Sequence, residues 1–278
     1  MINNLKAVIA DIDGTLVTKG EGMMPLTHDA IEILHKHGVL FGLASGRPVT
    51  SSMYNRKNQW NLSFDFDVMI GINGAQLKDC FHEEMEEYYK LPKETMREIL
   101  DLMRPFDCAV QVYDGEQMYA TKIDASILAS MKRNNVEMIV KTEDEICSKE
   151  NFNLIFRFDP AMTDEIVSYV EARPSEKYIG VMTSSGIMEF MDPRINKGLA
   201  VEMFAKRNNI PLDEIMCFGD MQNDLGMMKS GAWSVCLKNG CKECKEAADA
   251  VTEHDCNDDG VGHYLFDHVI VPSGWDKD

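Results

Sequence analysis

The sequence lacks several features that would place it in a specialised class. Its 278 residues include no run of about eighteen apolar residues, the minimum for a membrane-spanning helix. The first apolar stretch ends at Asp11, too early for a secretory signal. Positive charge is scarce: 28 Lys and Arg oppose 46 Asp and Glu, which gives a formal charge of −18, and no basic cluster occurs. We therefore expect neither nucleic acid nor a membrane surface as a partner.

The cysteines do not form the pattern of a disulfide framework. All eight are spread along a chain of ordinary composition, which favours reduced thiols and a cytoplasmic location. Cys241 and Cys244 have the spacing of half a zinc site, but no second pair or suitably spaced histidines follow them, so zinc binding is not favoured. The chain length allows one large domain or two ordinary ones, and we expect two.

Short apolar segments alternate with amphipathic segments at both ends of the chain. Residues 7–10, 39–43, 68–70, 215–218 and 233–237 are typical of buried strands, and residues 28–38 and 198–207 are typical of helices. Thr27 is the expected N-cap of the first helix, and Gly38 is its expected end. This alternation predicts an α/β fold with a doubly wound, Rossmann-like parallel sheet.

The middle of the chain has a different pattern. It offers helices at 92–103 and 163–172 and strands at 108–113, 117–122 and 153–158, with Asp114-Gly115 as a hairpin turn. The α/β pattern returns near residues 187–191. We therefore predict a core domain formed by residues 1–82 and 187–278, with an α+β cap domain, residues 83–186, inserted into it.

Polar residues follow the expected strands or begin a helix at four places. They are Asp11 and Asp13, then Ser45, then Lys197, and finally Asp220, Asn223 and Asp224. In an open α/β sheet such strand ends meet at the edge that binds ligands. Four carboxylates gathered there cannot all stay ionised without a cation. Because no histidine or cysteine converges on these oxygen ligands, they favour Mg²⁺.

Such a site suits phosphoryl transfer, which depends on positioning and on neutralising spread negative charge. Asp11 has no histidine or cysteine rival as the nucleophile and can form an aspartyl-phosphate. Asp13 could protonate the leaving alkoxide. Gly14 lets the backbone turn, and Thr15 is expected to hold that turn through a local hydrogen bond. Lys197 and Ser45 would donate to the anion.

Four segments carry a family resemblance: DIDGTLV (11–17), LASGRP (43–48), INKG (195–198) and GDMQNDLGMM (219–228). In this order they resemble the motifs of the haloacid dehalogenase-like hydrolase superfamily. Their spacing is similar to that of its Cof-type, subfamily IIB phosphatases, and NGA at 73–75 and DDGVGHYL at 258–265 also look like Cof-type signatures.

The resemblance implies a role for each matching residue. Asp11 would be the nucleophile, Asp13 the acid/base, Ser45 the hydroxyl on the transferred phosphoryl group and Lys197 the charge stabiliser. Beyond these matches, Gly46, Arg47 and Asn73 are candidate substrate-binding residues. Arg47 could instead be a solvated surface side chain, and Asn73 could instead occupy a turn set by Gly74. The Mg²⁺ ligands would be Asp11, the carbonyl of Asp13, Asp220 and Asp224, with Asn223 as a polar contact beside them.

The expected function is that of a cytoplasmic, Mg²⁺-dependent phosphatase of small phosphorylated metabolites, with sugar phosphates as the leading class. The resemblance implies that the cap selects the substrate, and the expected state is a monomer or weak homodimer. Two alternatives stay open. A phosphotransferase of the same fold would pass phosphate from Asp11 to a sugar hydroxyl, and a non-catalytic metabolite-binding or regulatory protein would bind without turnover.

Overall fold

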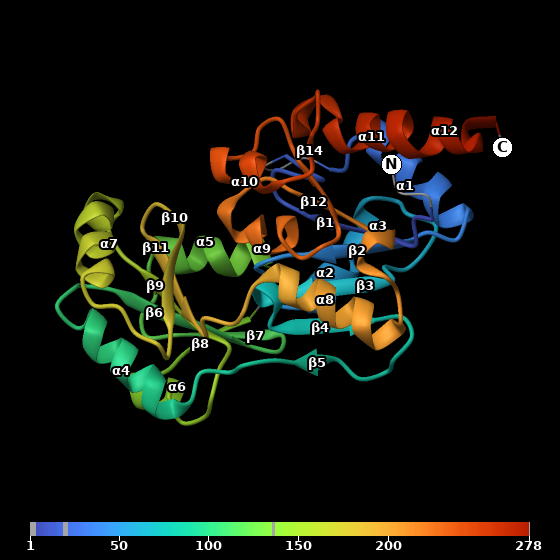
Figure 1. Cartoon of the computed structure of the whole chain (residues 1–278). Helices are drawn as coiled ribbons and strands as arrows, with labels where there is room; N and C mark the ends of the chain where they lie inside the picture. Colours follow the sequence, from blue (N-terminus) through green and yellow to red (C-terminus); the bar gives the residue numbers. More distant parts are fainter. Residues whose placement is uncertain (1–3, 19–21, 135–136, 278) are drawn as a thin grey trace. The chain divides into compact units, whose positions relative to one another are not determined.

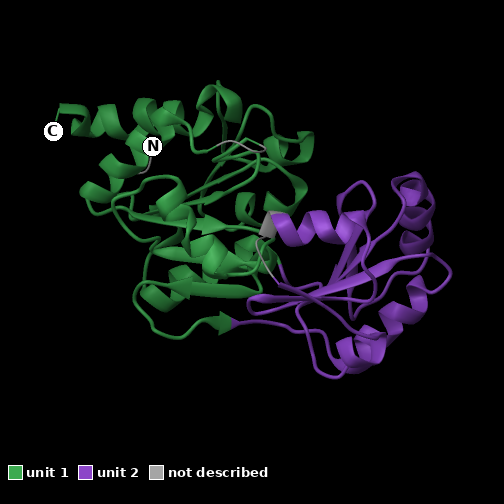
Figure 2. Ribbon diagram, turned by 180° about the vertical axis from the view of Figure 1, so that it is seen from behind, with its two compact units in different colours: residues 1–86, 196–278 green, residues 87–195 purple. Residues whose placement is uncertain are grey.

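The computed structural model describes residues 4–18, 22–134 and 137–277. The chain divides into two compact units, coloured separately in Figure 2. Unit 1 comprises residues 1–86 and 196–278, and unit 2 comprises residues 87–195. Among the described residues, no helix has the length and apolar character that crossing a membrane would require.

Unit 1 is built on a mainly parallel sheet. Its strands are β1 (Ala7–Asp11), β2 (Leu40–Ala44), β3 (Val68–Gly71), β4 (Gln76–Asp79), β5 (Glu86–Glu87), β12 (Ile215–Gly219), β13 (Trp233–Cys236) and β14 (Ala250–Val251). They lie in the order β14-β13-β12-β1-β2-β3-β4-β5. The strands from β14 to β3 pair in parallel, and β4 returns antiparallel to β3. The carboxyl ends of β1, β2 and β12 therefore lie side by side, as the sequence predicts.

Helices cover the sheet of unit 1 on both faces, which confirms the predicted doubly wound architecture. They are α1 (Pro25–Lys36), α2 (Ser51–Tyr54), α3 (Arg56–Gln59), α8 (Lys197–Asn208), α9 (Leu225–Met228), α10 (Lys242–Ala247), α11 (Gly260–Leu265) and α12 (Val271–Ser273). Figure 1 shows α1 and α11 along one face and α8 on the other. Val8 and Ala10 of β1 share a buried apolar cluster with Ile31 of α1 and Leu265 of α11, so this face is a continuous core.

The first helix begins differently from the prediction. Its N-cap is Met24, with Pro25 in the first turn, and Thr27 is buried inside the helix. The carboxylate of Asp259 accepts from the backbone N–H groups of Leu26 (3.0 Å) and Thr27 (2.8 Å) and from the Thr27 hydroxyl (2.7 Å). The expected Thr27 cap is therefore wrong, because a residue 232 positions away satisfies the free N–H groups at this helix end.

Unit 2 contains a mostly antiparallel sheet of six strands. The strands are β6 (Ala109–Asp114), β7 (Gln117–Ala120), β8 (Glu137–Val140), β9 (Asn153–Arg157), β10 (Ile179–Ser184) and β11 (Ile187–Met191). They lie in the order β10-β11-β9-β6-β7-β8, and only the β7–β8 pair is parallel. The hairpin predicted at Asp114-Gly115 is confirmed by the antiparallel pairing of β6 with β7.

Helices pack on both faces of this second sheet. They are α4 (Lys93–Met103), α5 (Ala125–Asn134), α6 (Glu143–Ile146) and α7 (Thr163–Glu171). Phe156 of β9 packs in one cluster with Ile99 of α4 and Ile166 of α7. Its neighbour Ile155, on the opposite face, packs with Ile127 of α5. Helices α4 and α7 were predicted from the sequence, whereas α5, α6, β8 and β10 were not.

The boundaries of the two units differ from those predicted at 82/83 and 186/187. The structure places them at 86/87 and 195/196. Residues 187–191, expected to rejoin the first sheet, instead form β11, which pairs antiparallel with both β9 and β10. Three further residues after β11 lead to Ile195, where unit 2 ends. That assignment of residues 187–191 is therefore corrected.

Candidate functional site

Three buried aspartates meet at the carboxyl end of the sheet in unit 1. Asp11 is the last residue of β1, Asp220 directly follows β12, and Asp224 closes the short helical turn after it. One carboxylate oxygen from each lies within 4.8 Å of the others, and the exposed fractions are only 7%, 5% and 0%. Within the described parts of the chain no other group of three histidines, cysteines or acids gathers in this way, and Cys241 and Cys244 are not in such a group.

Lys197 joins two of these aspartates. It is the first residue of α8, whose start is fixed because the Asn196 side chain accepts from the N–H of Leu199. Its Nζ donates to Oδ1 of Asp11 at 2.5 Å and to Oδ1 of Asp224 at 2.6 Å, and the lysine has no exposed surface. Burial alone would lower the pKa of Lys197, but the two carboxylates outweigh it and raise that pKa.

The crowding of buried carboxylates shifts their pKa values upward. Burial, reinforced by the charges of Asp224 and Asp220, raises the pKa of Asp11 to about 7 although Lys197 opposes the shift. Burial and the charge of Asp224 raise the pKa of Asp220 to about 6. When ionised, three carboxylates and one ammonium carry a net charge of −2 (−3 + 1). A divalent cation would neutralise this net charge. The cluster offers only oxygen donors, which fit a hard ion such as Mg²⁺.

Asp224 also shapes the loop around it. Its Oδ2 accepts from the backbone N–H groups of Asp220 (2.9 Å) and Met221 (3.0 Å), while Oδ1 faces Lys197. The carboxylate therefore holds the turn that presents Asp220. Asn223 is exposed, and its Nδ2 donates to Oδ1 of Asn73 at 3.3 Å. Its role beside a metal stays a prediction.

The loop after β1 contacts Asp220 directly. Gly14 has a φ of +96°, and a Cβ there would lie 2.5 Å from Oδ2 of Asp220, so a larger residue does not fit. The hydroxyl of Thr15 donates to Oδ1 of Asp220 at 2.9 Å. The prediction of a local hydrogen bond from Thr15 is thus wrong, because its partner lies on another strand end. The sequence carried no signal for this pair.

Asp13 lies beside the cluster and pairs with Arg47. Nη2 of Arg47 donates to both carboxylate oxygens of Asp13, at 2.8 and 2.6 Å, and the Asp13 side chain is 44% exposed. The structure therefore brings Asp13 and Arg47 together at the solvent side of the site. The predicted ligand role of the Asp13 carbonyl stays a prediction.

The loop after β2, which carries Ser45, is held by hydrogen bonds to the backbone. Ser45 is buried, its N–H donates to the carbonyl of Ile70 (2.8 Å), and its hydroxyl accepts from the N–H of Arg47 at 3.2 Å. The N–H of Asn73 donates to the Ser45 carbonyl at 3.0 Å, and Asn73 has a φ of +52°. Gly46 faces the Asn73 amide, since a Cβ at Gly46 would lie 3.2 Å from its Oδ1. Ser45, Gly46 and Asn73 thus form one tight loop pair.

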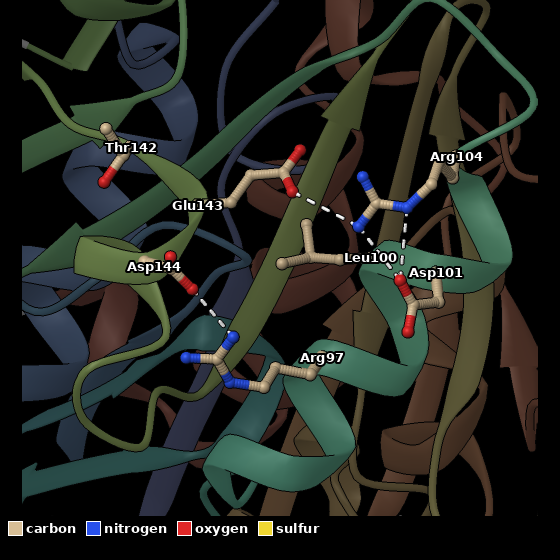
Figure 3. A pocket seen from close by; sticks show the side chains of 7 residues that line it. All are labelled: Arg97, Leu100, Asp101, Arg104, Thr142, Glu143 and Asp144. Carbon is tan, nitrogen blue, oxygen red and sulfur yellow. Dashed lines mark hydrogen bonds and ion pairs between the residues drawn. The ribbon is translucent and has the colours of Figure 1, made fainter.

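A separate pocket lies in unit 2 between α4 and α6 (Figure 3). Its volume is about 460 Å³. Arg97 lies 2.7 Å from Asp144, and Arg104 lies 2.9 Å from Asp101 and 3.6 Å from Glu143. Both arginines already face carboxylates, and the acids outnumber them. The lining therefore does not favour an anionic ligand.

The comparisons with known proteins agree with this geometry. Residues 8–265 match the family model described as haloacid dehalogenase-like hydrolase. A protein of Streptococcus pyogenes serotype M6 with the name "Putative phosphatase" is 26% identical over 271 residues, covering 96% of this chain and 99% of that protein. The Bacillus subtilis protein YitU, named as a 5-amino-6-(5-phospho-D-ribitylamino)uracil phosphatase, is 21% identical over 95% of this chain and 97% of its own length.

Solved structures are similar over almost the whole chain. TM0651 from Thermotoga maritima superposes with a TM-score of 0.81 at 25% identity, covering 95% of this chain and 97% of that one. BT4131, described as a subclass IIB sugar phosphatase of the haloacid dehalogenase superfamily, gives a TM-score of 0.79 at 20% identity, with coverages of 97% and 99%.

Proposed function

Because the chain belongs to the haloacid dehalogenase-like hydrolases, we propose that it is a phosphatase of small phosphorylated metabolites, with sugar phosphates as the leading class. The family match confirms the predicted family and enzyme class. The proposal rests above all on the buried group of Asp11, Asp220 and Asp224 with Lys197 between two of them. Two relatives also support it. Their names contain the word phosphatase, and each aligns with this chain over nearly its full length.

We propose Mg²⁺ as the cofactor, held by Asp11 and Asp220, with Asp224 behind them. The three buried carboxylates support a cation there, because it would offset their mutual repulsion when ionised, and their oxygen donors suit a hard ion such as Mg²⁺. Bound there, Mg²⁺ would neutralise charge on the transferred phosphoryl group.

Asp11 is the proposed nucleophile. Its carboxylate oxygen forms a bond to phosphorus while the bond between phosphorus and the ester oxygen breaks, which gives an aspartyl-phosphate and a leaving alkoxide. Asp13, two residues along and more exposed, donates a proton to that alkoxide. Lys197 holds Asp11 in place and offsets negative charge beside it.

Hydrolysis of the intermediate reverses these roles. Asp13 takes a proton from a water molecule, the water oxygen bonds to phosphorus, and the bond to Asp11 breaks, which releases inorganic phosphate. In the structure Nη2 of Arg47 donates to both carboxylate oxygens of Asp13. We propose that Arg47 moves to the substrate phosphate when it binds, which frees Asp13 to carry a proton. The Ser45 hydroxyl is the proposed additional donor to the phosphoryl oxygens.

Substrate choice is assigned to unit 2. By the family resemblance, we propose that residues 87–195 act as the cap that selects the leaving group. A cytoplasmic location is also proposed, and the eight free cysteines support it because reduced thiols are usual in that compartment.

The test is phosphate release from a panel of hexose phosphates, nucleotides, flavin mononucleotide and pyridoxal phosphate, with and without Mg²⁺. We expect Mg²⁺-dependent release by the wild type and a loss of at least a thousandfold in Asp11→Asn. Asp65→Asn changes an exposed aspartate in the same unit and serves as the matched control. Equal inertness of wild type and Asp11→Asn across the panel would contradict hydrolysis, and a phosphorylated acceptor in place of free phosphate would indicate a phosphotransferase.

A further inference from the structure

Asn239 lies in the turn after β13 and bonds to two other segments of unit 1. Its Nδ2 donates to the carbonyl oxygen of Gly14 at 2.8 Å, and its Oδ1 accepts from the backbone N–H of Cys256 at 2.9 Å. These two partners determine which end of the amide faces which way. A single side chain thus joins the loop after β1 to the segment before α11, although Gly14 and Asn239 are 225 positions apart.

The same turn also holds the loop that carries Asp220. The backbone N–H of Cys241 donates to the carbonyl oxygen of Asp220 at 2.8 Å. Gly240 is packed so closely that a Cβ there would lie 3.0 Å from that carbonyl oxygen and 2.4 Å from Sγ of Cys236. The turn that contains Asn239 therefore packs tightly against the backbone of Asp220, with no room for a side chain at Gly240.

Gly14 completes the connection, because it packs directly on the Asp220 carboxylate. Asp13 precedes Gly14, and Thr15 follows it and donates to Asp220. A shift of the Gly14 backbone must therefore change how Asp13 and Asp220 are placed relative to Asp11. Displacements of about 1 Å in a reacting group of residues can cost roughly a hundredfold in rate.

We propose that Asn239 is a positioning residue for the phosphatase reaction, which fixes the Asp13–Thr15 loop against the Asp220 loop. This inference rests on the proposed function. Asn239 acts through Gly14 and has no assigned contact with the reacting atoms.

The first test compares the steady-state kinetics of Asn239→Ala, Asn239→Asp and wild type with p-nitrophenyl phosphate and saturating Mg²⁺. Asn239→Ala loses both hydrogen bonds, and we expect kcat to fall about tenfold to a hundredfold with KM within about twofold. Asn239→Asp keeps an acceptor for Cys256 but replaces the donor to Gly14, so its kcat should fall at least as far. Asn257→Ala, an exposed asparagine on the neighbouring segment, should match the wild type.

The second test needs no activity and uses the metal-free protein. Hydrogen–deuterium exchange of the peptide covering residues 13–17 should be faster in both Asn239 variants than in wild type and Asn257→Ala, while peptides from unit 2 stay unchanged. Unchanged kcat and unchanged exchange at 13–17 would overturn the proposal. Faster exchange throughout unit 1, with a lower melting temperature, would also overturn it in favour of a general stabilising role. If the wild type hydrolyses no phosphate ester, the proposed function fails, and exchange alone then confirms or overturns the placement of the loop by Asn239.

Discussion

Replacing Lys197 by methionine tests whether the site is held together electrostatically. Lys197 is completely buried and lies within 2.6 Å of carboxylate oxygens of both Asp11 and Asp224. Methionine has a similar length but no charge, so the two buried carboxylates would lose their common counter-charge. Removing one partner of a buried ion pair typically costs about 3–5 kcal/mol. The raised pKa of Lys197 means that this stabilisation is present below about pH 10 and lost only as the pH rises through the folded-state pKa.

The assay is calorimetric melting of the metal-free protein near neutral pH. At roughly 2–4 °C per kcal/mol for a folding unit of about 150–250 residues, the melting temperature of Lys197→Met should fall by roughly 6–20 °C. Lys206→Met is the matched control, because Lys206 is an exposed lysine on the same helix, α8. Its unfolding free energy should change by no more than about 0.5 kcal/mol.

A double variant separates charge from packing. Asp224→Asn removes one of the two carboxylates that Lys197 contacts, so Lys197→Met should cost less in that background than in the wild type. Additive losses in the double variant would indicate that lost packing, and not uncompensated charge, causes the effect. A Lys197→Met protein that melts within about 2 °C of Lys206→Met would refute the electrostatic reasoning altogether.

Three further changes test other parts of the site and its support. Thr15→Val removes the hydroxyl that donates to Asp220, so the Mg²⁺ concentration for half-maximal phosphatase activity should rise severalfold; an unchanged value in a Mg²⁺ titration would contradict this role. Burial raises the pKa of Asp11 to about 7 and of Asp220 to about 6, so the folded metal-free protein binds more protons than the unfolded chain between about pH 4 and 7. Its unfolding free energy should therefore fall as the pH rises through that window. Mg²⁺ should accordingly raise the melting temperature more at about pH 8 than at about pH 5, and equal shifts in thermal melts would count against it. Asp259→Ala removes the carboxylate that accepts three hydrogen bonds at the start of α1 and should cost about 1–2 kcal/mol in a denaturant titration; an unchanged unfolding free energy would contradict this capping role.

The sequence was most informative about the candidate-site residues that lie at the ends of strands. Asp11 ends one apolar run and Asp220 follows another, and parallel pairing brings such ends to one edge whatever the details of the loops. Lys197 could be placed there because it begins a helix within the same alternating pattern. The convergence of these three residues needed only the strand order, which the alternation of strands and helices strongly restricts.

Partners that lie far apart in the chain could not be predicted in the same way. The bonds from Thr15 to Asp220, from Asn239 to Gly14 and from Asp259 to α1 each span more than 200 positions. Local patterns report which residues favour a turn or cap, but not which distant group satisfies them.

The wrong assignment of one strand to the first sheet has a similar cause. The segment Ile187–Met191 is an apolar run that fits either sheet, and its place is decided by antiparallel pairing with β9 and β10. Short apolar runs do not reveal whether a strand is parallel or antiparallel, so a boundary that depends on this distinction is poorly fixed by sequence.

The charges of the site also dictate how a phosphate ester can enter it. The chain carries a formal charge of −18, and Lys197 and Arg47, which lie beside Asp11 and Asp13, already contact carboxylates; the charge of Arg56 also acts on both aspartates. A phosphate dianion therefore approaches cations that are already paired with carboxylates. The cluster of three aspartates and Lys197 carries a net charge of −2 when the aspartates are ionised. An added cation, or the transfer of Arg47 from Asp13 to the phosphate, would make the approach more favourable. Under the proposed function, we therefore infer that Mg²⁺ and substrate bind in a mutually reinforcing way, since each supplies the charge that the other requires.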